Sequence, residues 1–314
     1  MNDQRSPTTR SSASALRVAV TQFELRAERS VDEFLAHVER LVAGAVAHGA
    51  ELVVFPELAS TGLLGAINDH AVTGDTLHDD YHHFLAPLFD EIAAGIAGIA
   101  AVHGVVVLGG SHNRIASDGS LRNTAVLAHP DGRLETQDKL HLTPQEHDLG
   151  TIGGDDLLVT TVGPFTVGVQ ICADIQFPEL TRVLLAAGVE MVLAPSLTWN
   201  RRGVFRVRTG CHARAIENQL FVVMSPLVGS SGLPVNSPMY AIGQAVVTGP
   251  VDRTVGRNDG VMASSESAIE DTVVVTLDRD LILASRETPE APGIKLHRPD
   301  LYPRLTTRLG VSAR

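Results

Sequence analysis

The strongest constraint on the fold is an apolar strand pattern that stops at a cysteine and gives way to a helix within a few residues. Residues 166–171 are mostly apolar and rich in β-branched side chains, which is typical of a buried strand. Cys172 ends this run, and Pro178 suits the first turn of a helix but cannot continue a strand ladder. At such a junction, unpaired amides and the helix dipole favour a thiolate. A buried structural cysteine is the commoner role, so this stretch alone leaves packing and catalysis both open.

Similar apolar runs alternate with helical patterns along the rest of the chain, which indicates an α/β fold. Ser30 and Glu33 have capping-box spacing ahead of a helix, and a Pro-Asp-Gly turn at 130–132 predicts a hairpin. Residues 109–111 predict a turn at a strand end, and the polar residues 143–156 predict a loop. The predicted strands are 16–23, 51–55, 105–110, 123–129, 133–138, 167–171, 190–194, 220–224, 244–248 and 272–277, and the predicted helices are 31–48, 82–103, 180–188 and 203–219.

Two segments of the chain resemble each other. Residues 49–58 read GAELVVFPEL and residues 188–197 read GVEMVLAPSL, and each follows a predicted strand and helix. This echo predicts two similar halves, each a sheet covered by helices. Because no low-complexity stretch or long linker separates the halves, we expect a single domain over residues 15–285.

The two ends of the chain differ in composition from this domain. Residues 1–14 are polar and rich in Ser, Thr and Arg, which predicts a disordered lead-in. They also lack the apolar core of a signal peptide, so the sequence favours a cytoplasmic protein. The last ~35 residues alternate Pro, Arg and isolated apolar side chains. We therefore expect 286–314 to form an irregular C-terminal arm that lies in an oligomer interface.

Composition excludes several classes of function. A formal net charge of −11 over 314 residues argues against a nucleic-acid partner, and no apolar run reaches the ~18 residues that cross a bilayer. The two cysteines do not form a disulfide framework, and Cys211 falls in a helical run that favours a packed core thiol. His78, His82 and His83 lie near two aspartates but lack the spacing of a metal site, so we expect exposed helix-start residues and no metal.

Three predicted strands end in reactive side chains, namely Glu57, Lys139 and Cys172. Because strand ends meet at one edge of a sheet, we expect these side chains to lie close together. A carboxylate in an apolar pocket has a raised pKa and can act as the base for a thiol, while an ammonium favours the thiolate and stabilises an oxyanion. Taken singly, a solvated strand end and a surface lysine are the simpler interpretations, and only the three together predict catalysis.

Five motifs resemble the carbon–nitrogen hydrolase (nitrilase) superfamily, and the first three contain Glu57, Lys139 and Cys172 in the family's order and spacing. The resemblance covers about residues 16–303. It implies an α/β fold built as a four-layer α-β-β-α sandwich, and pairing of chains into a homodimer or a higher even-numbered oligomer. The motifs are FPELASTG (55–62), KLHLTPQE (139–146), QICADIQFPEL (170–180), HARAIENQ (212–219) and RPDLY (298–302).

The resemblance implies a role for each reactive residue. Glu57 is the expected general base, Cys172 the nucleophile and Lys139 the oxyanion stabiliser, and the peptide N–H of Ala173 is the expected second oxyanion donor. Glu146 matches a family glutamate that orients these groups, and its alternative is an exposed loop carboxylate. The implied reaction forms a Cys172 thioester from a small amide or nitrile and then hydrolyses it, with no metal or organic cofactor.

Some positions depart from the pattern of the amidase members of this family. Ala173 and Gln176 stand where many amidases have an aromatic residue and an arginine, which leaves the substrate open. Asp174 resembles the amidase and carbamoylase members more than the nitrile-cleaving ones. We therefore expect an amidase that converts a small amide to acid and ammonia. A nitrilase or N-carbamoyl amide hydrolase with the same triad is one alternative, and a non-catalytic binding or scaffold member is another.

Residues 201–208 resemble the nitrilase part of bacterial acetyltransferase–nitrilase fusions, a subgroup with ill-defined substrates. Trp199, Thr198 and Arg201 follow a predicted strand end on the same edge as Cys172. They are candidate substrate-binding residues, because a guanidinium pairs well with a carboxylate. A solvated helix start, with Trp199 as a lid over the core, fits the pattern equally well.

Overall fold

Strand β1 (Ala15–Arg26) joins the two halves of the protein in the computed structural model, which describes residues 13–67, 72–231, 240–291 and 293–310. It pairs in parallel with β2 and β9 and antiparallel with β12 (Asp271–Asp278). The strand path is β5 (Leu134–Asp138), β4 (Leu121–Ala128), β3 (Val106–Ile115), β2 (Leu52–Val54), β1, β9 (Phe221–Ser231), β8 (Met191–Ser196), β7 (Phe165–Val169) and β6 (Val159–Val162).

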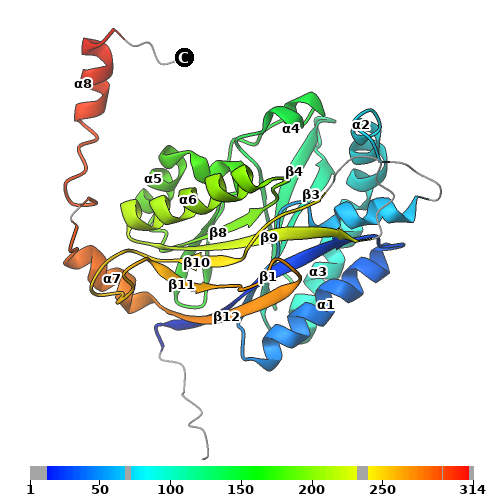
Figure 1. Ribbon diagram of the computed structural model, residues 1–314, viewed down its shortest axis with the longest axis horizontal. Coiled ribbons are helices and arrows are strands. Elements are labelled where there is room, and N and C mark those ends of the chain that lie inside the picture. The colour runs from blue at the N-terminus through cyan, green and yellow to red at the C-terminus, as the bar shows by residue number, and fades with distance from the viewer. Residues whose placement is uncertain (1–12, 68–71, 232–239, 292, 311–314) are drawn as a thin grey trace, which may run out of the picture.

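The strands form two layers that lie between two layers of helices (Figure 1). Helices α1 (Val31–Ala47) and α3 (Phe89–His103) cover one side. Helices α5 (Pro178–Ala186) and α6 (Arg201–Asn218) cover the other. The large mixed sheet and its helical covers confirm the predicted four-layer α-β-β-α sandwich.

The central strands are apolar throughout because both of their faces are buried. Ala19, Val53 and Val107 pack in the core beneath α1 and α3. Their neighbours Val18 and Val54 point the other way, into a core that they share with the second half of the protein. All five residues have an exposed fraction of 0%, so a polar residue at any of them would be buried on one face or the other.

The two similar segments of the sequence have similar local structures. Gly49 follows α1 and Gly188 follows α5, with φ angles of 78° and 87°, a conformation that glycine adopts without strain. Each glycine ends a helix and leads into a parallel strand, β2 in the first half and β8 in the second. The prediction that each half is a sheet covered by helices is therefore confirmed.

The helix predicted at 82–103 is longer and less regular than expected. It is a run of α2 (Leu77–Asp79), a π turn η2 (Asp80–Leu85), a 3-10 turn η3 (Ala86–Leu88) and α3. Pro87 lies where the helix type changes. Proline has no N–H to donate, so it interrupts the regular hydrogen bonding of a helix. By length and composition the run Leu77–His103 could cross a membrane, which corrects the expectation that no segment reaches that length. Ile92 and Ile96 of this run pack in the core beneath the sheet.

Two segments that the sequence predicts to be irregular contain helices. The polar stretch 143–156 begins with α4 (Pro144–Asp148). The C-terminal stretch contains α7 (Arg279–Glu287), which the Asp278 side chain caps, and α8 (Leu301–Arg308). Pro303 does not prevent α8, because it lies in the first turn, where N–H groups have no partner within the helix.

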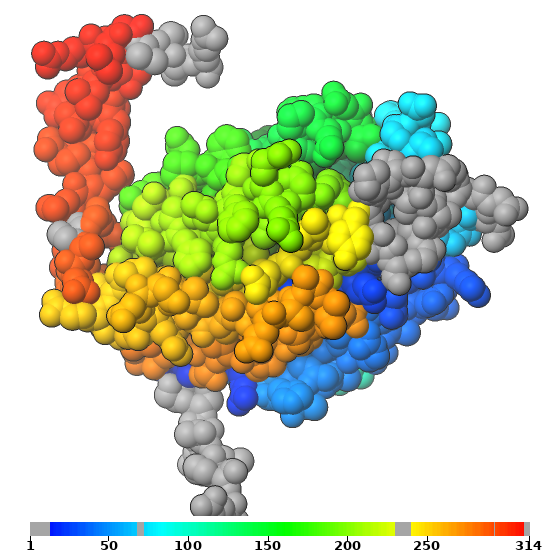
Figure 2. Space-filling model, in the orientation of Figure 1, coloured from blue at the N-terminus to red at the C-terminus, as the bar shows by residue number. Residues whose placement is uncertain are grey.

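Helix α8 stands away from the sheets, and none of its residues is buried (Figures 1 and 2). Its place in an oligomer interface stays a prediction. The lead-in predicted at 1–14 lies outside the described residues up to residue 12. Strands β6 and β11 (Val261–Ser264) were not predicted, because they are short and only partly buried, whereas β10 (Val246–Thr248), β12 and the hairpin of β4 and β5 follow the sequence pattern.

Candidate active site

Glu57 is held by a close approach between the end of β2 and a bulge in β3. The N–H of Ser111 donates to the carbonyl of Pro56, and the hydroxyl of Ser111 accepts from the N–H of Leu58. Gly110 has a φ of 84°, and a Cβ there would lie 2.0 Å from the Pro56 oxygen. Residues 109–111 are therefore not a turn at a strand end. They are a register shift inside β3 that fixes the backbone on both sides of Glu57.

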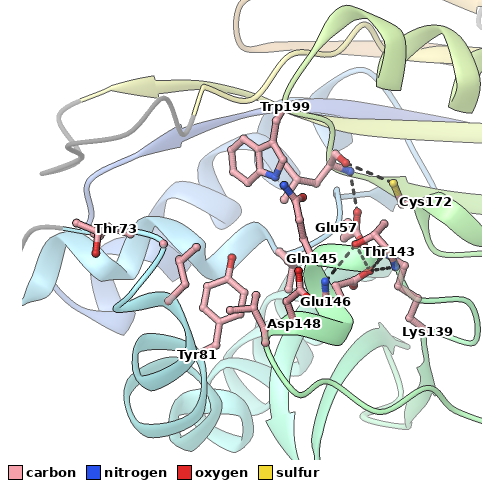
Figure 3. A pocket seen from close by; sticks show the side chains of 16 residues that line it. Glu57, Thr73, Tyr81, Lys139, Thr143, Gln145, Glu146, Asp148, Cys172 and Trp199 are labelled. Atoms are coloured by element: carbon pink, nitrogen blue, oxygen red, sulfur yellow. Dashed lines mark hydrogen bonds and ion pairs between the residues drawn. The ribbon is translucent and has the colours of Figure 1, made fainter.

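Lys139 follows β5 directly, and its ammonium lies between two carboxylates (Figure 3). Its Nζ is 2.6 Å from Oε1 of Glu57 and 2.7 Å from Oε2 of Glu146. The side chain is 1% exposed, so these charge-assisted bonds are shielded from water. A buried ammonium without such partners would be costly, which makes the three side chains one structural unit.

Glu146 is fixed by the capping box of α4. The side chain of Thr143 accepts from the N–H of Glu146, and the Glu146 carboxylate accepts from the N–H and hydroxyl of Thr143 at 2.8 and 2.9 Å. Thr143 and Glu146 have the spacing of this motif in the sequence. The cap turns the carboxylate inward toward Lys139, so Glu146 is not an exposed loop residue.

Asn123 is a fourth member of this cluster that the sequence did not single out. Its Nδ2 donates to Oε1 of Glu57 and to Oε1 of Glu146, both at 3.0 Å. The residue is 2% exposed, and its backbone carbonyl accepts from the N–H of Lys139 at 2.8 Å. The sequence signal for this role was an asparagine at the start of the strand predicted at 123–129. It was weak, because many buried asparagines only satisfy backbone groups.

Cys172 begins a single 3-10 turn, η4 (Cys172–Gln176), and has a left-handed backbone with a φ of 47°. Helix α5 starts at Pro178, as the sequence predicts, and the 3-10 turn lies between the strand and this helix. The Sγ atom donates to the carbonyl of Leu197 at 3.4 Å, and Oε2 of Glu57 accepts from the N–H of Leu197 at 2.9 Å. The backbone of Leu197 therefore contacts both the Cys172 thiol and the Glu57 carboxylate.

Asp174 ties the turn of the cysteine to the segment after Lys139. Its buried carboxylate accepts from the N–H groups of Ile171 at 3.1 Å, His141 at 2.7 Å and Leu140 at 3.4 Å. Burial raises the pKa of Asp174 in spite of these donors. The N–H of Ala173 is among the first amides of η4, which have no acceptor within such a turn.

Glu57 and Glu146 flank the same ammonium, yet their pKa values move in opposite directions. Burial raises the pKa of Glu57, and the positive charge of Lys139 offsets only part of the rise. Burial also acts to raise the pKa of Glu146, but Lys139 and the donors Thr143 and Asn123 outweigh it and hold the pKa below its usual value. Such a separation assigns different protonation roles to the two groups: Glu57 can exchange a proton, and Glu146 stays ionised.

The resting state of the other two groups follows from the same charges. Burial acts to lower the pKa of Lys139, but the carboxylates of Glu57 and Glu146 outweigh it and raise that pKa, so Lys139 is an ammonium. Burial and the negative charge of Glu57 raise the pKa of the Cys172 thiol well above its usual value. The free protein therefore holds a neutral thiol, which agrees with the expectation that the thiol needs a carboxylate as its base.

These groups open into a cavity of about 510 Å³ (Figure 3). Glu57, Lys139, Glu146 and Cys172 contribute to its wall near the thiol. The rest of the wall is a mixture of aromatic, apolar and uncharged polar residues with one further carboxylate. These residues are Leu58, Val72, Thr73, Gly74, Leu77, Tyr81, Thr143, Gln145, Asp148, Leu149, Leu197 and Trp199.

Of the three candidate substrate-binding residues, Trp199 alone lines this cavity as defined by the described residues. The Thr198 hydroxyl is occupied by the carbonyl of Ile242 at 2.5 Å. Arg201 begins α6 with an exposed side chain, so its guanidinium does not face the cavity. In the described part of the chain, no three His, Cys, Asp or Glu side chains form a cluster that could hold a metal ion. Cys211 is a free thiol packed in the core, as predicted.

The amino-acid sequence is similar to a known protein family and to individual proteins. Residues 17–286 match the family described as carbon–nitrogen hydrolase. The chain is 32% identical over 296 residues to the probable hydrolase YhcX of Bacillus subtilis, which covers 93% of this chain and 55% of that protein. It is 32% identical over 181 residues to an (R)-stereoselective amidase of a Pseudomonas species, which covers 57% of this chain and 60% of that protein. The chain thus spans 55% to 60% of the length of these two relatives.

Solved structures share the fold. The amidase from Nesterenkonia sp. AN1 in complex with acrylamide gives a TM-score of 0.72 at 21% identity, over 93% of this chain and 97% of that one. A mutant of the same amidase, with the acetamide moiety of fluoroacetamide added covalently to its active-site cysteine, gives 0.70 at 20% identity, over 92% of this chain and 96% of that one. At this identity the likeness concerns the architecture of the sheets and helices.

Proposed function

The chain belongs to the carbon–nitrogen hydrolase family, and from this premise we propose that it is a thiol-dependent amidase that converts a small amide to an acid and ammonia. The observation that carries the proposal is the buried cluster of Glu57, Lys139 and Glu146, which faces the Cys172 thiol in one cavity. The Nesterenkonia amidase, whose active-site cysteine takes up an acetamide group, gives it further support.

In the first half of the reaction, Glu57 accepts the proton of the Cys172 thiol while Sγ attacks the amide carbonyl carbon. Negative charge then develops on the carbonyl oxygen. An ammonium has three N–H donors, and Lys139 spends two of them on Glu57 and Glu146, so the third is free for this oxygen. The N–H of Ala173 is the second donor.

The tetrahedral intermediate collapses when Glu57 returns its proton to the amide nitrogen. The C–N bond breaks, ammonia leaves, and the acyl group stays on Cys172 as a thioester. In the second half, Glu57 accepts a proton from water, whose oxygen attacks the thioester carbon. The C–S bond breaks, the proton returns to sulfur, and the carboxylic acid is released. The raised pKa of Glu57 suits it to accept and return protons in both halves.

Glu146 acts in this proposal as a positioning residue and not as a second base. Its lowered pKa keeps it ionised through the cycle, so it holds Lys139 as an ammonium. Glu146 also shares the ammonium of Lys139 with Glu57. If Lys139 paired with Glu57 alone, the pKa of Glu57 would be lower and Glu57 would be a weaker base.

The experiment that tests the proposal measures ammonia release from a panel of small aliphatic amides. Wild type and Cys211→Ala, in which a buried thiol outside the cavity is removed, should release ammonia at similar rates. Cys172→Ala should release none. Equal rates for wild type and Cys172→Ala would remove the hypothesis. Acid formed from nitriles alone would indicate a nitrilase, and carbon dioxide from a ureido compound would indicate an N-carbamoyl amide hydrolase.

Three further expectations stay part of this proposal. They are a cytoplasmic location, a homodimer or higher even-numbered oligomer, and membership of the fusion subgroup that residues 201–208 resemble. Light scattering coupled to size-exclusion chromatography tests the second, because a single mass of 33 kDa per particle would exclude it.

A further inference from the structure

The charges on the cavity wall are unevenly balanced. Four charged residues line the cavity within the described chain, and three of them, Glu57, Glu146 and Asp148, are acidic. The fourth, Lys139, is bound to both Glu57 and Glu146. Asp148 has no ion pair or side-chain hydrogen bond to any described residue, and its carboxylate is exposed at the cavity wall. It is therefore a negative charge available to a bound molecule.

Two aromatic rings line the same cavity as this carboxylate. Figure 3 shows the ring of Tyr81 beside Asp148 and the indole of Trp199 across the cavity, with Cys172 at the other end. Tyr81 is 5% exposed, and burial raises its pKa, so it is a neutral phenol. The faces of such rings attract cations. A carboxylate and two aromatic residues that line one cavity are groups that suit an ammonium ion.

We propose that the acyl part of the substrate carries a cationic group, such as a protonated amine, which lies between Asp148, Tyr81 and Trp199 while its amide reaches Cys172. This inference rests on the proposed amidase function and names the substrate class of the same cavity. A carboxylate at that position would face Asp148 without a counter-ion, because no arginine and no second lysine lines the cavity in the described chain. Substrates with an anionic acyl chain are therefore disfavoured.

The test compares kcat/KM for three kinds of amide of matched length: ω-aminoamides with two to five methylene groups, the uncharged alkyl amides, and the ω-carboxyamides. Wild type should prefer the best aminoamide over its uncharged counterpart by about five- to tenfold, the effect of one exposed ion pair with added ring contacts. It should discriminate more strongly against the carboxyamide.

Two variants locate the preference. Asp148→Asn should reduce the ratio of kcat/KM between aminoamide and alkyl amide about fivefold, and Asp148→Lys should turn the preference toward the carboxyamide. The matched control is Asp156→Asn, which removes an exposed carboxylate that does not line the cavity. It should leave the ratio as in wild type.

The outcomes separate this inference from the function on which it rests. If wild type cleaves alkyl amides and aminoamides equally well, or if Asp148→Asn and Asp156→Asn give the same ratio, the charge preference is refuted and the amidase function stands. If wild type releases ammonia from none of these amides, the amidase function fails and the inference fails with it.

Discussion

The replacement Glu146→Gln tests the electrostatics of the site, because it removes one negative charge while keeping the shape of the side chain. The contacts of 2.6 and 2.7 Å to the shared Nζ of Lys139 place Oε1 of Glu57 and Oε2 of Glu146 no more than 5.3 Å apart. At that separation and an effective dielectric constant of about 20, one unit charge contributes about 3 kcal/mol, or about two pH units.

The sign follows from the state of Glu57. The negative charge of Glu146 contributes to the raised pKa of Glu57, so its removal lowers that pKa. The glutamine amide keeps one acceptor oxygen, so Lys139 or Asn123 loses one of its two acceptors and binds Glu57 more strongly, which acts in the same direction. The acid limb of the profile of kcat/KM against pH should move down by about one to two pH units. The plateau should also fall, because a weaker base accepts the thiol proton less readily.

The measurement is the pH profile of ammonia release by wild type, Glu146→Gln and the control Glu179→Gln, which neutralises an exposed carboxylate on α5. If turnover by Glu146→Gln is too slow, the rate of Cys172 alkylation by iodoacetamide in a Cys211→Ala background reports the same ionisation. An acid limb that stays in place or moves up would refute the assignment of Glu57 as the proton acceptor.

Three other replacements have expected outcomes. Asn123→Leu removes the donor shared by Glu57 and Glu146, so the acid limb should move up, opposite to Glu146→Gln, and an unmoved limb would count against this role. Lys139→Met leaves two buried carboxylates without a cation and should lower the free energy of unfolding by about 3–5 kcal/mol in urea titrations; wild-type stability would contradict the buried pairing. Asp174→Ala leaves three N–H groups without their acceptor, so it should lower the free energy of unfolding by about 2–4 kcal/mol and reduce kcat. A wild-type thermal midpoint would contradict the structural role of this carboxylate.

The sequence predicted the fold well where apolar runs and turn residues decide the local structure. The strand that leads to Cys172, the hairpin around 130–132 and the cap of α1 at Ser30 all follow from neighbouring residues. The composite helix before α3 was harder, because its π turn depends on packing over the sheet and not on the residues within it. Helix α7 was missed because its stability comes from one capping side chain and from burial of Ile282 against the second half.

The candidate site was predictable in part for a similar reason. Glu57, Lys139 and Cys172 each follow a strand, so the order of strands brings them together at one edge. Asn123 donates to Glu57, which is 66 positions away, and Asp174 accepts from the N–H groups of Leu140 and His141, 34 and 33 positions away, so no local pattern marks these contacts. The need for a base followed from the chemistry of a thiol, but only the folded protein reveals that burial outweighs the effect of the nearby ammonium on the pKa of Cys172.

The central claim is that Cys172 takes up the acyl group of an amide, and mass spectrometry of the quenched enzyme tests it most directly. Wild-type protein is mixed with an amide that it hydrolyses, stopped with acid within the first turnover and digested. The account predicts that the peptide containing Cys172 gains the mass of the acyl group and that the peptide containing Cys211 does not. Ammonia release with no acyl mass on Cys172 in that first turnover would contradict the account.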